Sequence, residues 1–276
     1  MTTWVFLRGL IREQRHWGQF PVQFQHEFPN VNVVTLDLPG NGTLYREPSP
    51  TRVEDMAQFC RQELLRHGLP PPYRLLALSL GAMVAVAWSA LHPDEIDACV
   101  LINTSLRPFN PFYRRLRPHN YLKLIGSLYR DLAWRERLIL QLTSNREESQ
   151  DALVEDWIRF QHEFPVSRRN ALRQLLAAMG YRAPRSKPPA SMLVLGSSQD
   201  RLVDNRCSQQ LVQQWQADSA FHPTAGHDLP LDDGPWIART VKAWLASKEI
   251  ATGMAMIDSS GAPEVIIATP KLASKE

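Results

Sequence analysis

The sequence has 276 residues, of which 44% are hydrophobic, and its 31 Lys and Arg against 28 Asp and Glu give a formal charge of +3. This length and apolar content suffice for one large α/β domain or for a core with a sizeable insertion, and the small net charge gives no support for nucleic-acid binding. Because Cys60, Cys99 and Cys207 are far apart and lie in apolar segments, we expect neither a disulfide framework nor a metal site.

The first segment, MTTWVFLRGLIREQRHW, runs directly into a strand-like stretch and carries arginine at positions 8, 12 and 15. It lacks the basic and then apolar order of a secretory signal. No segment is long and apolar enough to span a bilayer. We therefore expect a soluble, cytoplasmic protein without a membrane span.

Short β-rich segments alternate with amphipathic helical segments over most of the chain. One predicted helix covers Val53–Gly68, where Met56, Phe59 and Leu64 recur at helical spacing. Strand, helix and strand in succession predict right-handed crossovers and a mostly parallel sheet that is buried on both faces. The β-rich segments begin at Trp4, Val31, Tyr73, Asp97, Ser191 and Asp218.

The alternation is interrupted once, in residues 107–187. This interval has no convincing strand, opens with proline-rich sequence and continues with helical periodicity, so we expect a helical cap over the core. It holds 14 Arg and 2 Lys against 8 acidic residues, a balance of +8. We therefore predict an α/β core of residues 1–106 and 188–246 and a basic helical cap of residues 107–187.

Residues 247–276 are rich in Ala, Ser, Gly and Pro, and the pentapeptide LASKE at 245–249 recurs at 272–276. Five residues are too short to indicate a repeat architecture. We expect a C-terminal extension or tag, in which disorder is one outcome. The alternative is that PEVIIATP forms a short extra strand or a docking arm.

Ser79 stands between a strand-like run and a helical run in ALSLG. A residue at such a turn lies at the carboxyl edge of a parallel sheet and at a helix N-terminus, where developing negative charge is stabilised. Ala77 and Gly81 supply the small neighbours that the crowded turn requires, one methyl group away from the G-x-S-x-G pattern. Ser79 is therefore a candidate nucleophile, with helix capping as the alternative.

A serine nucleophile needs a base, and the base needs an acid that holds its tautomer. Asp200 follows the strand-like VLGSSQD, and His227 lies in AGHD after the last such segment. Asp204 is the nearby rival for the acid role, although helix capping suits it better. Asp228 follows the histidine too closely to orient its ring and, with Asp232 and Asp233, indicates a solvated turn.

These motifs together resemble those of the α/β-hydrolases, over roughly residues 4–246. The resemblance rests on LRGL, DLPGNG, ALSLG, LHPDEIDACVLINTS, GSSQD and AGHD. Within that superfamily the chain is most similar to small capped carboxylesterases of the pimeloyl-carrier-protein methyl ester esterase type. It implies a sheet of about six strands without the usual N-terminal hairpin, and acyl-enzyme hydrolysis without metal or organic cofactor. It further implies Ser79 as nucleophile, His227 as base, Asp200 as orienting acid, and an oxyanion hole from the backbone N–H groups of Leu10 and Leu80.

The family's usual His-Gly after the first strand is Arg8-Gly9 here, so the loop that carries Leu10 has a different support. Asp37 in DLPGNG is expected to fix its own loop. Candidate substrate contacts are Trp17, whose alternative is packing of the first helix, and Arg114, Arg115 and Trp134 in the cap.

The cap arginines offer bidentate donors to a carboxylate, a phosphate or an acidic acyl carrier protein; the alternative is a solvated basic surface. The expected function is therefore carboxylic-ester hydrolysis of a small-molecule or acyl ester. A thioesterase, a C–C hydrolase or an acyltransferase on the same triad is the alternative. A catalytically silent binding protein is a third possibility.

Overall fold

The computed structural model describes residues 1–127, 129–146 and 151–259. Its centre is a six-stranded sheet in the order β2-β1-β3-β4-β5-β6, and every pairing is parallel. The predicted sheet is therefore confirmed. The strands are β1 (Thr2–Leu7), β2 (Val31–Leu36), β3 (Tyr73–Leu78), β4 (Ile96–Ile102), β5 (Ser191–Ser197) and β6 (Asp218–His222).

Helices cover both faces of this sheet, because its central strands are apolar and buried on both faces. Helices α2 (Val53–Arg66), α3 (Leu80–Leu91) and α9 (Arg206–Trp215) contribute to one hydrophobic core. Helices α1 (Phe20–Glu27) and α10 (Leu229–Ser259) contribute to the other. The central strands β1, β3, β4 and β5 supply side chains to both cores, which fixes the sheet between the two helical layers.

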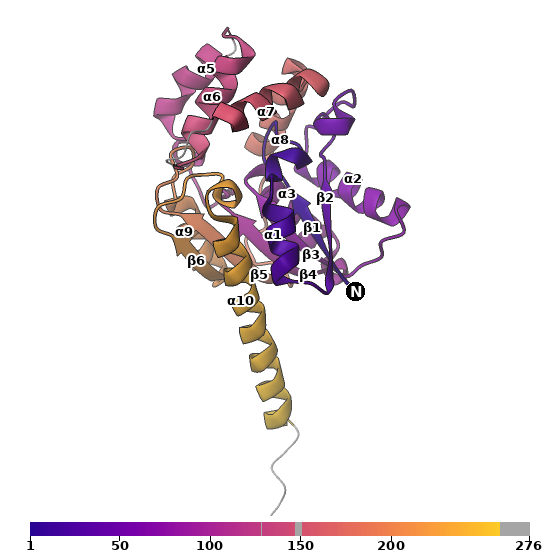
Figure 1. Ribbon diagram of the computed structural model, residues 1–276. Helices are drawn as coiled ribbons and strands as arrows, with labels where there is room; N and C mark the ends of the chain where they lie inside the picture. The colour runs from indigo at the N-terminus through magenta and orange to yellow at the C-terminus, as the bar shows by residue number, and fades with distance from the viewer. Residues whose placement is uncertain (128, 147–150, 260–276) are drawn as a thin grey trace, which may run out of the picture.

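A group of helices between β4 and β5 lies over one end of the core, as Figure 1 shows. These are α4 (Phe112–Arg115), α5 (Tyr121–Ser127), α6 (Leu132–Thr143), α7 (Asp151–Glu163) and α8 (Arg168–Gly180). The helical character of this segment agrees with the sequence, and its limits at 107 and 187 stay a proposal. Short 3-10 turns complete the fold: η1 (Gln14–Trp17), η2 (Gly42–Leu44), η3 (Pro93–Glu95) and η4 (Pro118–Asn120).

Helix α10 leaves the core at the opposite end (Figure 1) and continues past residue 246 to Ser259, after a non-helical residue at Asp233. The predictions for residues 260–276 lie outside the described residues. In the described part of the chain, no helix has the length and apolar character to cross a membrane.

Cys60, Cys99 and Cys207 are free and buried. Burial raises the pKa of each of these thiols to about 12, so they are protonated side chains of the core at neutral pH.

Candidate active site

Ser79 occupies a sharp turn between β3 and α3, with φ 56° and ψ −113°. A positive φ is strained for a residue with a Cβ, and such strain collects at functional sites. The turn is tight because Gly81 packs on the end of β1: a Cβ there would lie 2.3 Å from the Leu7 carbonyl oxygen. The Ser79 N–H donates to the Ile102 oxygen (2.9 Å), which fixes the turn to the neighbouring strand.

The loop after β1 passes directly beside this serine. A Cβ on Gly9 would lie 3.3 Å from the Cβ of Ser79. The next residue, Leu10, carries one predicted oxyanion donor, and Leu80 carries the other as the first residue of α3. The N–H groups in the first turn of a helix have no intrahelical acceptor, so that of Leu80 can serve a ligand. Both donor roles remain predictions.

A cap residue supports the loop after β1, called the oxyanion loop below for the predicted role of Leu10. Ile11, with φ 59°, donates its N–H to the Gln174 side-chain oxygen of α8 (2.9 Å). The amide nitrogen of the buried Gln174 donates in turn to Asn41 and Ser49 on the core (2.7 and 3.1 Å). No signal in the sequence singled out this glutamine, because its partners lie 125 to 163 residues away.

His227 and Asp200 meet at the carboxyl edge of the sheet. The His227 Nδ1 donates to Asp200 Oδ2 at 2.7 Å, and both residues are buried. The other carboxylate oxygen accepts the N–H groups of Leu202 and Val203 (2.8 and 2.9 Å). Because Nδ1 faces the carboxylate, the proton of a nucleophile would have to go to Nε2.

The charge environment of His227 favours its protonated form. Burial alone would lower its pKa, but the charge and hydrogen bond of Asp200, with a smaller effect of Asp228, raise the pKa above its ordinary value. An imidazolium that forms here is therefore stabilised, as a base that accepts a serine proton requires.

The rival carboxylates lie elsewhere. Asp204 accepts from the backbone N–H of Arg206 at the start of α9 (3.0 Å) and from the Arg206 guanidinium (2.6 Å). It thus serves the helix start, as the sequence suggested. Asp37 accepts the N–H groups of Gln14 and Thr43 (2.7 and 3.2 Å) and fixes its own loop, also as expected.

Asn103 supports the histidine loop and was missed by the sequence reasoning. It follows β4 with φ 45° and donates to the His227 backbone oxygen (2.8 Å) and to Ser197 Oγ (2.9 Å). Its oxygen accepts the N–H of Ser197 (2.8 Å). The only signal available was an asparagine directly after a buried strand, which tolerates a positive φ.

Arg8, which stands where the resemblance expects histidine, forms a buried ion pair with Asp228. Its two terminal nitrogens donate to the two carboxylate oxygens at 3.0 and 2.6 Å, and the side chains are 2% and 6% exposed. The guanidinium lies 4.8 Å from the centre of the Trp17 ring. The solvated turn expected at Asp228 is therefore wrong. The carboxylate faces inward because it neutralises an arginine that follows a fully buried strand.

Two more arginines of the same loop bind the cap. Arg12 donates to Glu136 of α6 at 2.8 Å, in a pair whose side chains are 8% and 2% exposed, and lies over Trp157 of α7. Arg15 pairs with Glu163 at the end of α7. Of the three N-terminal arginines, Arg8 thus connects the first loop to the histidine loop, and Arg12 and Arg15 connect it to the cap.

The end of α6 binds the histidine loop directly. The Asp228 N–H donates to the Thr143 oxygen at 2.7 Å. Ser144 Oγ and the Asn145 N–H donate to the two oxygens of Asp232 (2.6 and 3.0 Å). Helix α6 therefore contacts the oxyanion loop through Glu136 and the histidine loop through its C-terminal end.

The predicted substrate contacts take other positions. Trp17 is 2% exposed and packs on Phe6 and Phe20, so its ring belongs to the core and the substrate contact is not supported. The Arg115 guanidinium donates to the Ala178 oxygen of α8 (2.6 Å).

The backbone oxygen of Arg114 accepts from the Asp204 N–H at 3.0 Å, which ties α4 to the loop that carries Asp200. Trp134, on the first turn of α6, is 38% exposed and lies beneath Arg130. Neither contact reaches the triad. A substrate role for Arg114, Arg115 and Trp134 therefore stays a proposal.

Residues 27–233 match the family model described as serine aminopeptidase, S33. The chain belongs to this family of α/β-hydrolases. The resemblance inferred from the motifs is thus confirmed, and the protein is a hydrolase of that superfamily. The match fixes fold and class, not the bond or substrate on which this hydrolase acts.

Two curated relatives carry different names. The hydrolase is 32% identical over 92 residues to a pimeloyl-[acyl-carrier protein] methyl ester esterase of Chromobacterium violaceum, covering 33% of this chain and 34% of that protein. It is 20% identical over 260 residues to a Haemophilus influenzae protein named "Putative 2-succinyl-6-hydroxy-2,4-cyclohexadiene-1-carboxylate synthase", covering 86% of this chain and 95% of that protein. The chain therefore spans about a third of the esterase and nearly all of the synthase.

Among solved structures, 2-hydroxy-6-oxo-6-phenylhexa-2,4-dienoate hydrolase from Rhodococcus sp. strain RHA1 matches with a TM-score of 0.69 at 18% identity. The match covers 87% of this chain and 89% of that chain. At this identity it supports the fold alone.

Proposed function

We propose that the hydrolase cleaves carboxylic esters through an acyl-enzyme on Ser79. The observation that carries the proposal is the buried 2.7 Å contact between His227 and Asp200, at the same sheet edge as a serine on a strained strand-to-helix turn. A purely structural role explains these two features less well than catalysis does. Asp200 and His227 cap no helix, and a strained turn at Ser79 costs stability that a structural role would not require.

In the proposed reaction, Ser79 Oγ attacks the ester carbonyl carbon while its proton passes to His227 Nε2. Asp200 stabilises the imidazolium, and the Leu10 and Leu80 N–H groups donate to the oxyanion of the tetrahedral intermediate. Collapse breaks the bond to the alkoxy group, which leaves with the proton from His227. Water then repeats the sequence on the acyl-enzyme and releases the acid. No step in this chemistry calls for a metal or an organic cofactor.

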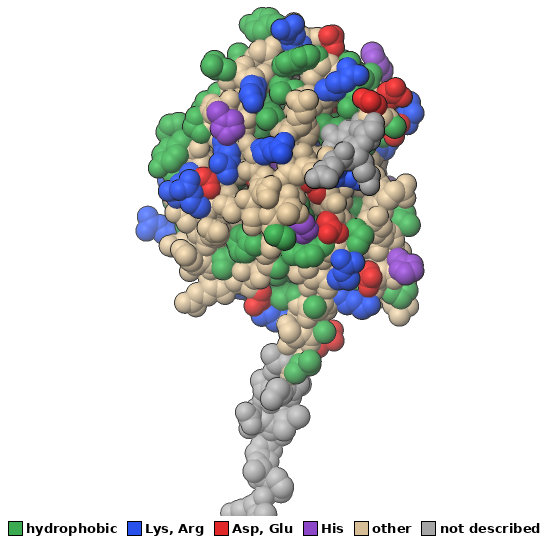
Figure 2. Space-filling model, turned by 60° about the vertical axis from the view of Figure 1, so that its left-hand side comes forward, with side chains coloured by type: hydrophobic (Ala, Val, Ile, Leu, Met, Phe, Trp, Pro, Cys, Tyr) green, Lys and Arg blue, Asp and Glu red, His purple; other side chains and the backbone are tan. Residues whose placement is uncertain are grey.

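The cap suggests the class of ester. Figure 2 shows many Lys and Arg side chains over the upper half of the molecule, interspersed with hydrophobic side chains and with fewer Asp and Glu side chains. We propose that the ester carries an acidic group or is presented on an acidic acyl carrier protein, with which the partial match to the esterase of C. violaceum agrees.

The test is labelling by a fluorophosphonate probe and turnover of p-nitrophenyl acetate. Wild type should react with both, and Ser79→Ala with neither, because only the hydroxyl is removed from a residue of intermediate exposure. Thermal unfolding of the variant serves as the control for its fold. Turnover that persists in Ser79→Ala after contaminating esterase is excluded contradicts the proposal.

A second candidate is another reaction on the same residues, such as thioester hydrolysis, C–C bond cleavage or acyl transfer. It is favoured by the match to the named synthase over 86% of the chain. A panel of esters, acyl thioesters and β-diketones of graded length separates the candidates by kcat/KM. A protein that reacts with the probe and turns over none of the esters supports the second candidate.

A further inference from the structure

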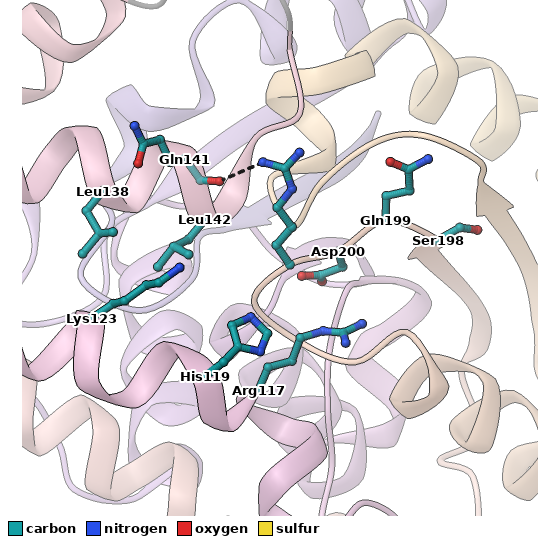
Figure 3. Close-up of a pocket in the computed structure, with 10 residues that line it drawn as sticks. Arg117, His119, Lys123, Leu138, Gln141, Leu142, Ser198, Gln199 and Asp200 are labelled. Atoms are coloured by element: carbon teal, nitrogen blue, oxygen red, sulfur yellow. Dashed lines mark hydrogen bonds between the residues drawn. The ribbon is translucent and has the colours of Figure 1, made fainter.

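A cavity lies against the loop that carries Asp200. It has a volume of about 570 Å³, and η4, α5 and α6 of the cap form one side while residues 198–201 form the other. Figure 3 shows Lys123, His119 and Leu138 across from Asp200, Gln199 and Ser198. Of the three proposed triad residues, only Asp200 is among the described residues that line it, so this is not the space above the serine.

Basic side chains from separate segments converge on this cavity. Arg117 and His119 come from the η4 region, Lys123 from α5 and Arg201 from the loop after β5. Among the residues that the structure describes, none of the four forms an ion pair. Arg117 also has a buried Nε without a hydrogen-bond partner.

The absence of carboxylate partners distinguishes these residues from several buried or half-buried arginines elsewhere in the described chain. Arg8, Arg12 and Arg61 each face a carboxylate at 2.6 to 2.8 Å. Arg201 instead has a long contact of 3.5 Å to the Gln141 backbone oxygen. The charge of Arg117 also acts on the carboxylate of Asp204, but that carboxylate is already bound by Arg206. Neighbouring cations repel each other, so their gathering at a cavity favours an anion between them.

Asp200, the one carboxylate among the described residues that line the cavity, does not oppose such an anion strongly. Asp200 Oδ2 accepts from His227, and Oδ1 accepts from the N–H groups of Leu202 and Val203. Its two oxygens thus already accept from His227 and from N–H groups of its own loop. The cavity has three cations, Arg117, Lys123 and Arg201, against this one carboxylate, counting His119 as neutral.

The other residues that line the cavity indicate the chemistry of the uncharged part of the ligand. Leu138 and Leu142 of α6 form an apolar side, and Gln141, Ser198 and Gln199 offer neutral polar groups. The volume lies within the range of about 300–1,000 Å³ that is typical of small-molecule sites. We propose that this cavity binds a small organic anion, a carboxylate or phosphate with a short apolar part.

This anion has two possible sources, and its binding does not depend on the proposed esterase activity. It can be the acidic end of the substrate, or a separate small molecule that acts on the triad through the Asp200 loop. Arg201 directly follows Asp200 in that loop. An anion bound to Arg201 would therefore change the position of Asp200, which binds His227.

The experiment is calorimetric titration of the full chain with phenyl phosphate, a phosphate monoester with one aromatic ring. Ser79→Ala is titrated as well, so that binding is measured without any contribution from catalysis. The cavity variants are Arg201→Gln and Lys123→Gln, both exposed side chains whose loss should leave the fold intact. Arg137→Gln is the matched control, because Arg137 is an exposed arginine of α6 that does not line the cavity.

We expect saturable binding in wild type and Ser79→Ala, weakened by about tenfold in each cavity variant, the factor for one lost charge-assisted hydrogen bond. Arg137→Gln should bind as wild type does. Absence of saturable binding, or equal weakening in Arg137→Gln, overturns the proposal. Phenyl phosphate that competes with an ester substrate assigns the anion to the substrate, whereas inhibition or activation at saturating ester assigns it to a separate ligand.

Discussion

Replacing Asp228 by Asn should destabilise the hydrolase far more than a surface ion-pair substitution does. Asp228 holds both terminal nitrogens of Arg8, and the two side chains are 6% and 2% exposed. The amide cannot neutralise the guanidinium, which would remain buried beside Trp17 with an uncompensated charge. Removing one partner of such a pair costs about 3–5 kcal/mol. For a chain of this size that is a fall in Tm of roughly 6–20 °C.

The matched control is Glu27→Gln. Glu27 pairs with Lys242 at 3.2 Å, with side chains 31% and 59% exposed. An exposed pair contributes about 0–1 kcal/mol, so this variant should unfold close to wild type. The assay is urea unfolding followed by circular dichroism, at one pH and ionic strength. A double variant, Arg8→Met with Asp228→Asn, should recover part of the loss, because it leaves no uncompensated charge in the interior and changes the side-chain volumes little.

The single variant Asp228→Asn should also change the pH dependence of catalysis. The Asp228 carboxylate contributes to the raised pKa of His227, and Arg8 acts in the opposite direction. Without the carboxylate the His227 pKa falls, so the rising limb of kcat/KM should move to lower pH. Asp228→Asn that is no less stable than Glu27→Gln, or a limb that does not move, would refute the role assigned to the pair.

In wild type the rising limb of kcat/KM should lie above the ordinary histidine pKa of about 6.5, because the pKa of His227 is raised; a pH-rate profile with p-nitrophenyl acetate tests this. Asp200→Asn should lower kcat by about 10⁴-fold, and Asp204→Asn should change it little; steady-state kinetics in which the order is reversed would make Asp204 the acid. Gly81→Ala should destabilise by about 1–3 kcal/mol in urea unfolding, since its Cβ would lie 2.3 Å from a carbonyl oxygen of β1. Gly126→Ala is the control: an added Cβ there has nothing within 4 Å, so this variant should not be destabilised.

The layout of the core could be predicted because it depends on patterns among residues that are close together in the sequence. Strand-like and helical periods set the six parallel strands and their order of appearance, and the residue after each strand reaches the carboxyl edge. That rule predicts that Ser79, Asp200 and His227 lie near one another, and the structure shows the contact between the last two. The same logic predicted that Asp37 fixes its loop and that Asp204 serves a helix start.

The support of the site could not be predicted, because its partners are far apart in the chain. Arg8 and Asp228 are separated by 220 residues, and Arg12 and Glu136 by 124. An aspartate next to a histidine has no local pattern that separates an inward carboxylate from a solvated one, so Asp228 was assigned wrongly. Gln174 likewise sits among leucines of α8 and gives no sign that its amide holds the oxyanion loop.

The contacts of α6 bear on whether the cap is a module that can be exchanged between hydrolases. A transplanted cap without a glutamate at 136 would leave Arg12 unpaired in the interior, and one without the Thr143–Asn145 end would release the turn that follows His227. Chimeras in which a foreign cap is joined at 107 and 187 should therefore fail unless the first loop and the last loop of the cap's own donor are carried over with it. Specificity in this protein would then evolve by changing side chains within the cap it has, rather than by replacing the whole segment.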